Sequence, residues 1–519
     1  MTGDTKRLLS AYVRRFNEND EELARHCVPD SAAEDWMLEN CPRIAVPDSA
    51  IEQTYYFRWW TYRKHIRNTP DGRIVTEFLP DVPWASDCNA IPCAAAHHIR
   101  EGRWLKDSSF LDEYIRFWLK RPLDQLHSYS NWFESSVESL AKVRGDETGP
   151  DIADDLVRSL QKWYDDRMTA SGLLWSNDDR DGSEYSISGP GLRPTLNSYI
   201  YAGNLSVAAM LDRKGDPGRA DMLRMRAEEL RSAMEQLWDE EKRFYITIPQ
   251  KSVSAVPYRT EQRRARELFG YLPWMFGAAA PGRADAFRQL LDENGFKGKA
   301  AASFAERRHP GYGIFYTGGE LNRWLASRGD PPAGEEGHEC LWNGPSWPYA
   351  TSLALTALAE LLSGGEKQDA VTPGDYSDLL HRYAASHVIR LEDGRVLPWI
   401  DENMDPDTGV WIARTRLRDW NGECFPAYKG GYERGKDYNH SVFCDCVLEG
   451  LFGIRPEWDA LTVAPLFPAS WDYARAEEVS VHGKSLTIRY EKESGYEVLL
   501  DGVVKFRSEK PEPCRIGYT

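Results

Sequence analysis

The sequence predicts an all-α toroid of paired helices, followed by a small antiparallel β module at the C-terminal end. Amphipathic helical patterns recur from the N-terminus to about residue 455. No fixed-period repeat relates these segments, which argues against a solenoid. Beyond residue 455, apolar and polar residues alternate, as expected for half-buried strands. We therefore assign residues 1–455 to a helical domain and residues 456–519 to a β-rich module packed on it.

The predicted helices are long enough to pair around a common core. Ile152, Leu156, Leu160 and Trp163 recur at helical spacing and line one face. The segment 349–362 is nearly all apolar and ends at two glycines, so this helix is expected to be buried on most sides. A further helix is expected to begin after Asp216-Pro217-Gly218 and to carry Leu223, Ala227, Leu230, Met234 and Leu237 on one face. Other helices are expected over residues 6–16, 49–66, 88–101, 108–120, 130–143, 195–212, 264–280, 283–293, 375–388 and 439–452.

The connections between these helices are uneven. Four long segments are rich in glycine, proline, tryptophan and charge, and they span residues 169–194, 241–262, 294–340 and 390–438. Long loops in a compact domain often carry function. A closed helical frame whose mouth is covered by such loops fits this pattern.

The C-terminal module is predicted from alternation and turns. Val479 and Val481 begin a period-two pattern that continues through residues 486–490 and 496–500. His482-Gly483 and Asp501-Gly502 are typical of two-residue hairpin turns. We expect a small antiparallel sheet.

Charge and hydropathy argue against several classes of partner. The 519 residues carry a formal net charge of −17, and no lysine–arginine cluster forms the basic face of a nucleic-acid-binding protein. No apolar run is long enough to span a membrane, and residues 1–17 lack the apolar stretch of a signal peptide. The nine cysteines show no zinc-site spacing, so we expect free thiols in the cytoplasm. The sequence does not indicate an oligomeric state.

Aromatic residues are abundant: 19 tryptophans, 25 tyrosines and 18 phenylalanines. Sugar rings present C–H faces that stack on aromatic side chains, so this composition fits a carbohydrate ligand. A large helical core rich in aromatic residues explains the same numbers. Both interpretations stay open on composition alone.

Two loops concentrate carboxylic acids beside tryptophans. The first runs from Trp175 to a predicted helix and contains four acids, among them Asp181 and Glu184. The second places Asp401 and Glu402 close to apolar residues, which favours the partial burial typical of a catalytic carboxyl. For any one of these acids, a solvated turn is the alternative interpretation.

Three further segments combine aromatic and polar residues. Each could bind a sugar, and each has a structural alternative: a helix cap, or an ion pair with a stacked ring. They contain Trp342, Asn343 and Trp347 at a helix entrance, Tyr438 and His440 before the last helix, and Arg58 and Trp59 near the N-terminus.

At three places the chain resembles the (α/α)6 glycoside hydrolases related to family 63 glucosidases, mannosylglycerate hydrolases and trehalases. Trp342-Asn-Gly-Pro-Ser-Trp347 is similar to their Trp-Arg-Gly-Pro-x-Trp segment. Glu402-Asn-Met-Asp-Pro-Asp-Thr-Gly409 resembles the stretch that holds their catalytic base. Arg180-Asp-Gly-Ser-Glu184-Tyr-Ser resembles the segment of their general acid, with Glu184 in the place of an aspartate. The chain also resembles a toroidal group that includes β-L-arabinofuranosidases.

The resemblance implies an (α/α)6 toroid that hydrolyses a glycosidic bond with inversion. In this mechanism one carboxyl is the general acid and the other is the general base. Glu184 or Asp181 would be the acid. Glu402 would be the base, with Glu423 and Glu433 as rivals. No metal and no organic cofactor is required. The expected substrate-binding residues are Trp175, Arg193, Asn197, Tyr199, Trp342, Asn343, Trp347, Trp399, Tyr438, His440, Arg58 and Trp59.

Two other functions fit the same scaffold. A polysaccharide lyase or sugar epimerase would use a Tyr–His pair with a cation, and Tyr438, His440 and Lys436 form such a set in the sequence. A non-catalytic sugar-binding protein is the third hypothesis, because a fold does not determine a function. The identity of the sugar, and whether the protein acts at chain ends, are not indicated.

Overall fold

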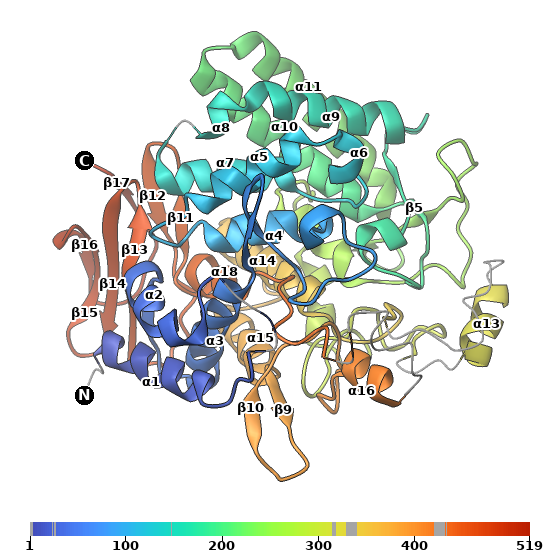
Figure 1. The fold of residues 1–519 in the computed structure, drawn as a ribbon. Helices are drawn as coiled ribbons and strands as arrows, with labels where there is room; N and C mark the ends of the chain where they lie inside the picture. Colours follow the sequence, from blue (N-terminus) through green and yellow to red (C-terminus); the bar gives the residue numbers. More distant parts are fainter. Residues whose placement is uncertain are drawn as a thin grey trace.

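The computed structural model describes residues 4–22, 24, 27–146, 148–313, 318–327, 340–419, 431 and 433–519. Within this part of the chain, six inner helical segments form a closed ring in which each contacts the next. Figure 1 shows α4, α14 and α18 near the middle of the molecule. In ring order the segments are α4 (Pro92–Gly102), α7 (Phe133–Arg144), α10 (Pro194–Lys214), η5–α12 (Leu268–Tyr271 and Leu272–Met275), α14 (Pro348–Ser363) and α18–η7 (Phe443–Asp445 and Cys446–Leu451).

Other helical segments alternate with the inner ones along the chain and form an outer layer. This alternation produces the helix pairs of the predicted toroid. The outer segments are α3 (Ser49–Lys64), α5 (Phe110–Lys120), α9 (Ala153–Arg167), α11 (Pro217–Met234), η6 (Ala284–Leu290) and α15 (Pro373–Ala385). The remaining described helices are α1 (Thr5–Asn17), α2 (Ala33–Asn40), α6 (Leu123–Leu126), α8 (Thr148–Asp151), α13 (Gly318–Ser327), α16 (Ile412–Asp419), and the short η1 (Asp30–Ala32), η2 (Asp87–Asn89), η3 (Asp179–Asp181) and η4 (Glu235–Leu237).

Proline fixes the start of several inner helices. Pro92, Pro194 and Pro348 stand at the first helical position of α4, α10 and α14, where the missing N–H costs nothing and φ is already helical. Left-handed Gly145 and Gly215 end α7 and α10. The residues just before each proline therefore have defined places at one end of the ring.

Two predicted helices are shorter than expected. The segment 264–280 is helical only over η5 and α12, since Pro273 lacks an N–H to donate into a longer helix. The segment 283–293 forms the 3-10 helix η6. Elsewhere the predicted spans agree with the observed helices to within a few residues.

The prediction of an all-α domain is too narrow, because short antiparallel strands lie between the helices. The short strands among the helices are β2 (Ile66–Thr69) with β3 (Gly72–Val75), β4 (Trp175–Ser176) with β5 (Gly191–Leu192) and β8 (Ile248–Pro249), β6 (Trp238–Asp239) with β7 (Phe244–Tyr245), and β9 (Val388–Arg390) with β10 (Val396–Pro398).

The C-terminal region forms two antiparallel sheets (Figure 1). The larger has the order β1-β13-β14-β15-β16, and its first strand comes from the N-terminal region. Its turns at His482-Gly483 and Asp501-Gly502 have positive φ at both residues, which confirms the predicted hairpins. The strands are β1 (Arg43–Ala45), β13 (Tyr473–Val481), β14 (Lys484–Glu491), β15 (Gly495–Leu500) and β16 (Val503–Ser508), with β11 (Ile454–Pro456), β12 (Ala460–Val463) and β17 (Cys514–Gly517) in the second sheet.

The described cysteines are all free thiols. In the same residues, every helix is too short or too polar to cross a membrane.

A buried ionic cluster joins the first and last inner helices. Asp445 accepts from Arg100 Nε at 2.8 Å and from Trp104 Nε1 at 2.6 Å, and it pairs with Arg103 at 2.8 Å. The two arginines hold the pKa of Asp445 below its usual range, against the effect of burial. Residues about 340 positions apart thus close the ring.

Removing the charge of Asp445 is expected to weaken the closure strongly. The substitution Asp445→Asn leaves two buried guanidinium groups short of a carboxylate, so the free energy of unfolding should fall by about 3 kcal/mol in urea titrations. Asp472→Asn, at an exposed pair with Lys492, is the matched control and should cost less than about 1 kcal/mol. Equal losses in the two variants would contradict this role.

Candidate active site

A cavity of about 340 Å³ lies where the loops preceding five inner helices meet. Phe78 and Trp84 precede α4, Tyr129 precedes α7, and the segment 179–184 precedes α10. Residues 340–347 precede α14, and residues 434–440 precede α18. The cavity is therefore at the N-terminal end of the inner ring, and its walls combine carboxyls with aromatic rings.

Glu184 lines this cavity without a cationic partner among the described residues. Burial, followed by the negative charges of Asp179 and Glu402, raises the pKa of Glu184 to about 8. Its backbone oxygen accepts from Trp342 N at 3.1 Å. This carboxyl is protonated at neutral pH and can donate a proton.

Glu402 lines the same cavity in the opposite electrostatic setting. Arg434 donates from Nε to Oε1 at 2.7 Å and from Nη2 to Oε2 at 3.3 Å, and Cys340 Sγ contacts Oε2 at 3.2 Å. Both members of the ion pair are almost completely buried. A bidentate guanidinium stabilises a carboxylate, so Glu402 is set up to accept a proton.

Asp401 supports the Glu402 backbone. Its Oδ1 accepts from Glu402 N at 2.7 Å, and the side chain is buried. Burial and the neighbouring Glu402 charge raise the pKa of Asp401 to about 7. Gly435 packs against this carboxyl so closely that a Cβ there would lie 1.9 Å from Oδ1.

Aromatic rings form one side of the cavity. Trp342 and Trp347 stack with centroids 4.0 Å apart and an interplanar angle of 9°, and both are lining residues. The Trp84 ring lies 4.9 Å from the Arg434 guanidinium carbon. Trp342 and Trp347 are almost completely buried, whereas Trp84 is exposed, so the Trp84 ring is the surface available to the C–H face of a sugar.

Glu77, Tyr438 and His440 form a polar group in the wall of the cavity. Glu77 Oε1 accepts from Tyr438 Oη at 2.8 Å and lies 3.1 Å from His440 Nδ1. Among the described residues, Glu77 Oε2 and His440 Nε2 are buried atoms without a hydrogen-bond partner. Because such atoms are costly to leave unpaired, they mark places where ligand hydroxyls can bind.

Asp181, the alternative general acid, has both carboxylate oxygens hydrogen-bonded to neighbouring side chains. Its Oδ2 accepts from Arg193 Nε at 2.6 Å, and its Oδ1 accepts from Ser130 and Ser176. The side chain is fully buried and does not line the cavity. The ion pair with Arg193 shapes the loop, so the structure favours Glu184 as the available proton donor.

Two backbone features fix the loop that carries Glu184. Gly182 is left-handed, and a Cβ there would lie 2.9 Å from Cys93 Sγ. Tyr185, directly after Glu184, has φ of 56° although it is not glycine. Such strain persists only where the surroundings impose it, and the neighbouring Ser188 provides one anchor because its N–H donates to Glu267 at 3.1 Å.

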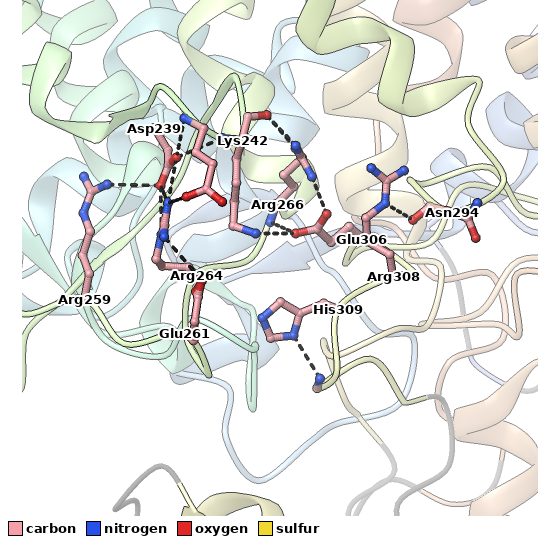
Figure 2. Close-up of polar contacts among 12 residues, drawn as sticks. Asp239, Lys242, Arg259, Glu261, Arg264, Arg266, Asn294, Glu306, Arg308 and His309 are labelled. Atoms are coloured by element: carbon pink, nitrogen blue, oxygen red, sulfur yellow. Dashed lines mark hydrogen bonds and ion pairs between the residues drawn. The ribbon is translucent and has the colours of Figure 1, made fainter.

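A network of charged side chains involves Arg266, the residue next to Glu267 in the sequence (Figure 2). Arg266, next to Glu267, pairs with Glu306 at 2.5 Å. Arg264 binds both oxygens of Asp239, at 3.0 Å and 3.1 Å. The Arg266–Glu306 pair lies beside the β-bridge between Glu267 and Ala305, so it joins these two segments.

The structure gathers six of the sequence-predicted residues in the cavity: Glu184, Glu402, Trp342, Trp347, Tyr438 and His440. The other predicted residues do not line it, and most of them hydrogen-bond to neighbouring loops and helices instead. These are Asp181, Trp175, Arg193, Asn197, Tyr199, Asn343, Trp399, Arg58 and Trp59.

Specific contacts explain why several of these side chains do not line the cavity. Trp175 donates to the Gln250 carbonyl at 2.7 Å, and Tyr199 Oη lies 3.1 Å from Tyr349 Oη. Asn197 binds the backbone of Leu174. Arg58 and Trp59 belong to the buried outer helix α3.

The structure describes only one of the two alternative general bases, Glu433 and Glu423. Glu433 pairs with Arg414 at 2.5 Å and does not line the cavity. Glu423 lies outside the described residues.

Sequence reasoning missed Glu77, Trp84, Tyr129, Cys340 and Arg434 as cavity residues. Arg434 follows Glu433, one of the candidate bases. The carboxylate that Arg434 binds, Glu402, lies 32 positions earlier in the sequence. Glu77 and Tyr129 stand alone in the sequence, without a motif that could have pointed to them. In the described residues, no group of three His, Cys, Asp or Glu side chains is arranged to hold a metal ion.

A family model described as the mannosylglycerate hydrolase MGH1-like glycoside hydrolase domain matches residues 87–441. This match spans all three motifs on which the resemblance rests, and it confirms that resemblance. No curated protein sequence matches the chain.

Solved structures extend the comparison. A structure named sialidase has a TM-score of 0.85 and 31% identity, and the alignment covers 99% of this chain but only 44% of that one. The chain thus spans less than half of that protein. A GH78 family rhamnosidase of Bacillus sp. GL1 has a TM-score of 0.53 at 14% identity, covering 88% and 41% of the two chains. A bacterial glucoamylase in complex with acarbose has a TM-score of 0.50 at 12% identity, covering 77% and 55%. At the two lower identities the likeness concerns the fold, which is that of (α/α)6 toroid proteins.

The raised pKa of Glu184 predicts how stability depends on pH. Above the ordinary pKa of 4.5 the unfolded chain releases this proton, whereas the folded chain keeps it up to about pH 8, so wild-type stability falls as pH rises through that window. Glu184→Gln cannot ionise. Relative to wild type, its free energy of unfolding should gain about 2–4 kcal/mol between pH 4.5 and pH 8 in chemical denaturation.

Glu493→Gln, at an exposed position, is the matched control for the loss of one glutamate. It should track the wild type at both pH values. A Glu184→Gln variant that also tracks the wild type would show that Glu184 is ionised in the folded protein at neutral pH.

Proposed function

Because the chain belongs to the mannosylglycerate hydrolase MGH1-like glycoside hydrolase domain family, we propose that it hydrolyses a glycosidic bond of an oligosaccharide or glycoside. One observation carries this proposal: a protonated carboxyl and an arginine-paired carboxylate line a single cavity beside stacked tryptophans. Glycoside hydrolysis requires such a pair, one group to donate a proton and one to accept it.

Glu184 is the proposed general acid. It protonates the glycosidic oxygen as the bond to the anomeric carbon breaks, so the leaving group departs as a neutral alcohol. Its pKa of about 8 keeps the proton available at neutral pH. The desolvation and negative neighbours that raise this pKa also make the proton transferable.

Glu402 is the proposed general base. It takes a proton from a water molecule that attacks the anomeric carbon from the opposite face, which inverts the configuration. Arg434 favours the ionised form in which Glu402 can accept that proton. Inverting enzymes keep the two carboxyls about 6.5–9.5 Å apart so that the water fits between them.

Substrate recognition is assigned to the rest of the cavity. The stacked Trp342 and Trp347 form part of the wall, the exposed Trp84 ring packs against the sugar, and Glu77 and His440 bind its hydroxyls. A cavity of about 340 Å³ suits one terminal sugar and its neighbour, which supports exo action. The free thiols support a cytoplasmic location.

The two alternatives have less support. A lyase or epimerase would need a free cation beside Tyr438 and His440. Lys436 Nζ pairs with Asp20 at 2.6 Å and does not line the cavity, and Arg434, which does line it, is paired with Glu402. A sugar-binding protein without activity has no use for the contrast between Glu184 and Glu402.

Replacing the base tests the proposed roles. Glu402→Gln keeps the size of the side chain but cannot accept a proton, so kcat should fall at least about 1,000-fold with little change in KM. The assay is release of nitrophenol from a panel of nitrophenyl glycosides, followed by plant and fungal oligosaccharides. Glu433→Gln, the matched control, should keep kcat within about tenfold of the wild type. The opposite ranking would move the base to Glu433.

Inversion has its own test. Proton nuclear magnetic resonance of the first product should show the anomer opposite to that of the substrate, before mutarotation sets in. A first product with the retained configuration would replace the attacking water by a covalent intermediate on a carboxyl.

A further inference from the structure

A second cavity, of about 640 Å³, lies between α15, β9 and the residues 408–415. None of its described lining residues lines the catalytic cavity. The segment that carries Glu402 also forms part of its wall: Met404 forms a β-bridge with Trp411, and Ile412 N donates to Asn403 O at 2.8 Å. The two cavities therefore share this loop but no described lining residue.

Basic side chains dominate this second cavity. Lys299, Arg382 and Arg390 line it, together with His381 and Arg414. Asp378 is the one described carboxylate among the lining residues. Such a concentration is notable in a chain whose net charge is −17.

Pairing separates these basic residues into two groups. His381 contacts Asp48 at 2.7 Å, and Arg414 pairs with Glu433 at 2.5 Å. Within the described part of the chain, Lys299, Arg382 and Arg390 have no carboxylate within ion-pair distance, and Arg382 reaches only the Lys299 carbonyl, at 3.5 Å. Three cations around one hollow repel one another, and an anion between them would relieve this repulsion.

The size and the donors of the cavity indicate the ligand. Guanidinium groups bind carboxylates in a bidentate manner. A volume of about 640 Å³ is within the range of about 300–1,000 Å³ typical of sites for small organic ligands, and it is far more than a lone oxyanion needs. We propose that this cavity binds a saccharide that carries a carboxylate. The choice of a saccharide rests on the proposed function, whereas the negative charge rests on the three cations.

Binding can be measured without turnover by isothermal titration of the full-length Glu402→Gln protein. The probes are a trigalacturonate, its neutral methyl ester and inorganic phosphate. We expect the trigalacturonate to bind, and both other probes to bind at least about tenfold more weakly, because one lacks the charge and the other lacks the sugar contacts.

A double substitution locates that binding. Lys299→Gln with Arg390→Gln, both at exposed positions, should weaken trigalacturonate binding at least about tenfold, with an unchanged melting temperature. The matched control is Arg116→Gln with Lys120→Gln on α5, which removes the same two charges from exposed positions outside the cavity. It should bind like the parent.

Three results would overturn the proposal: no binding of trigalacturonate, equal affinity for its methyl ester, or equal losses in the two double variants. Phosphate binding as tight as trigalacturonate would make this a site for a free oxyanion instead. None of these outcomes depends on hydrolysis. Conversely, a Glu402→Gln protein that kept full activity would refute the proposed base while the binding result stood.

Discussion

One electrostatic contrast distinguishes the two carboxyls of the cavity. Glu184 and Glu402 both line it, and of the two only Glu402 pairs with Arg434. Burial and the nearby negative charges leave Glu184 with a pKa of about 8. Glu184 therefore holds a proton that it can donate, and the arginine-paired Glu402 is placed to accept one. The arginine therefore decides the direction of proton flow, although it touches only one of the pair.

The toroid supplies the positions that this contrast needs. Five inner helices begin around the cavity, and proline fixes the start of three of them. The loops before these helices deliver the acid, the base, the tryptophans and the hydroxyl-binding group from distant parts of the chain. Asp445, in turn, holds the last inner helix to the first. The ring closure and the site are thus consequences of the same arrangement.

Local sequence patterns predicted most of the helices and the hairpin turns. The features that they missed depend on residues far apart in the sequence. Leu156, Leu160 and Trp163 are buried on α9 as their spacing indicates, and both glycine-containing hairpin turns formed. Pro273 broke a predicted helix, and β1 joined a sheet whose other strands lie more than 400 residues later. In the site, the motifs placed Glu184 and Glu402, but choosing between Glu184 and Asp181 required knowing that Arg193 binds Asp181. Arg434 and Glu77 were missed because each acts through a partner far away in the sequence.

The most direct test of this contrast is a carbon nuclear magnetic resonance titration of the protein labelled at its glutamate carboxyls. Spectra of the wild type and of Glu184→Gln should differ by one resonance, which titrates near pH 8 in the wild type and is absent from the variant. If the resonance that disappears instead titrates near 4.5, the ordinary value for glutamate, then Glu184 is an ordinary carboxylate and cannot be the proton donor at neutral pH.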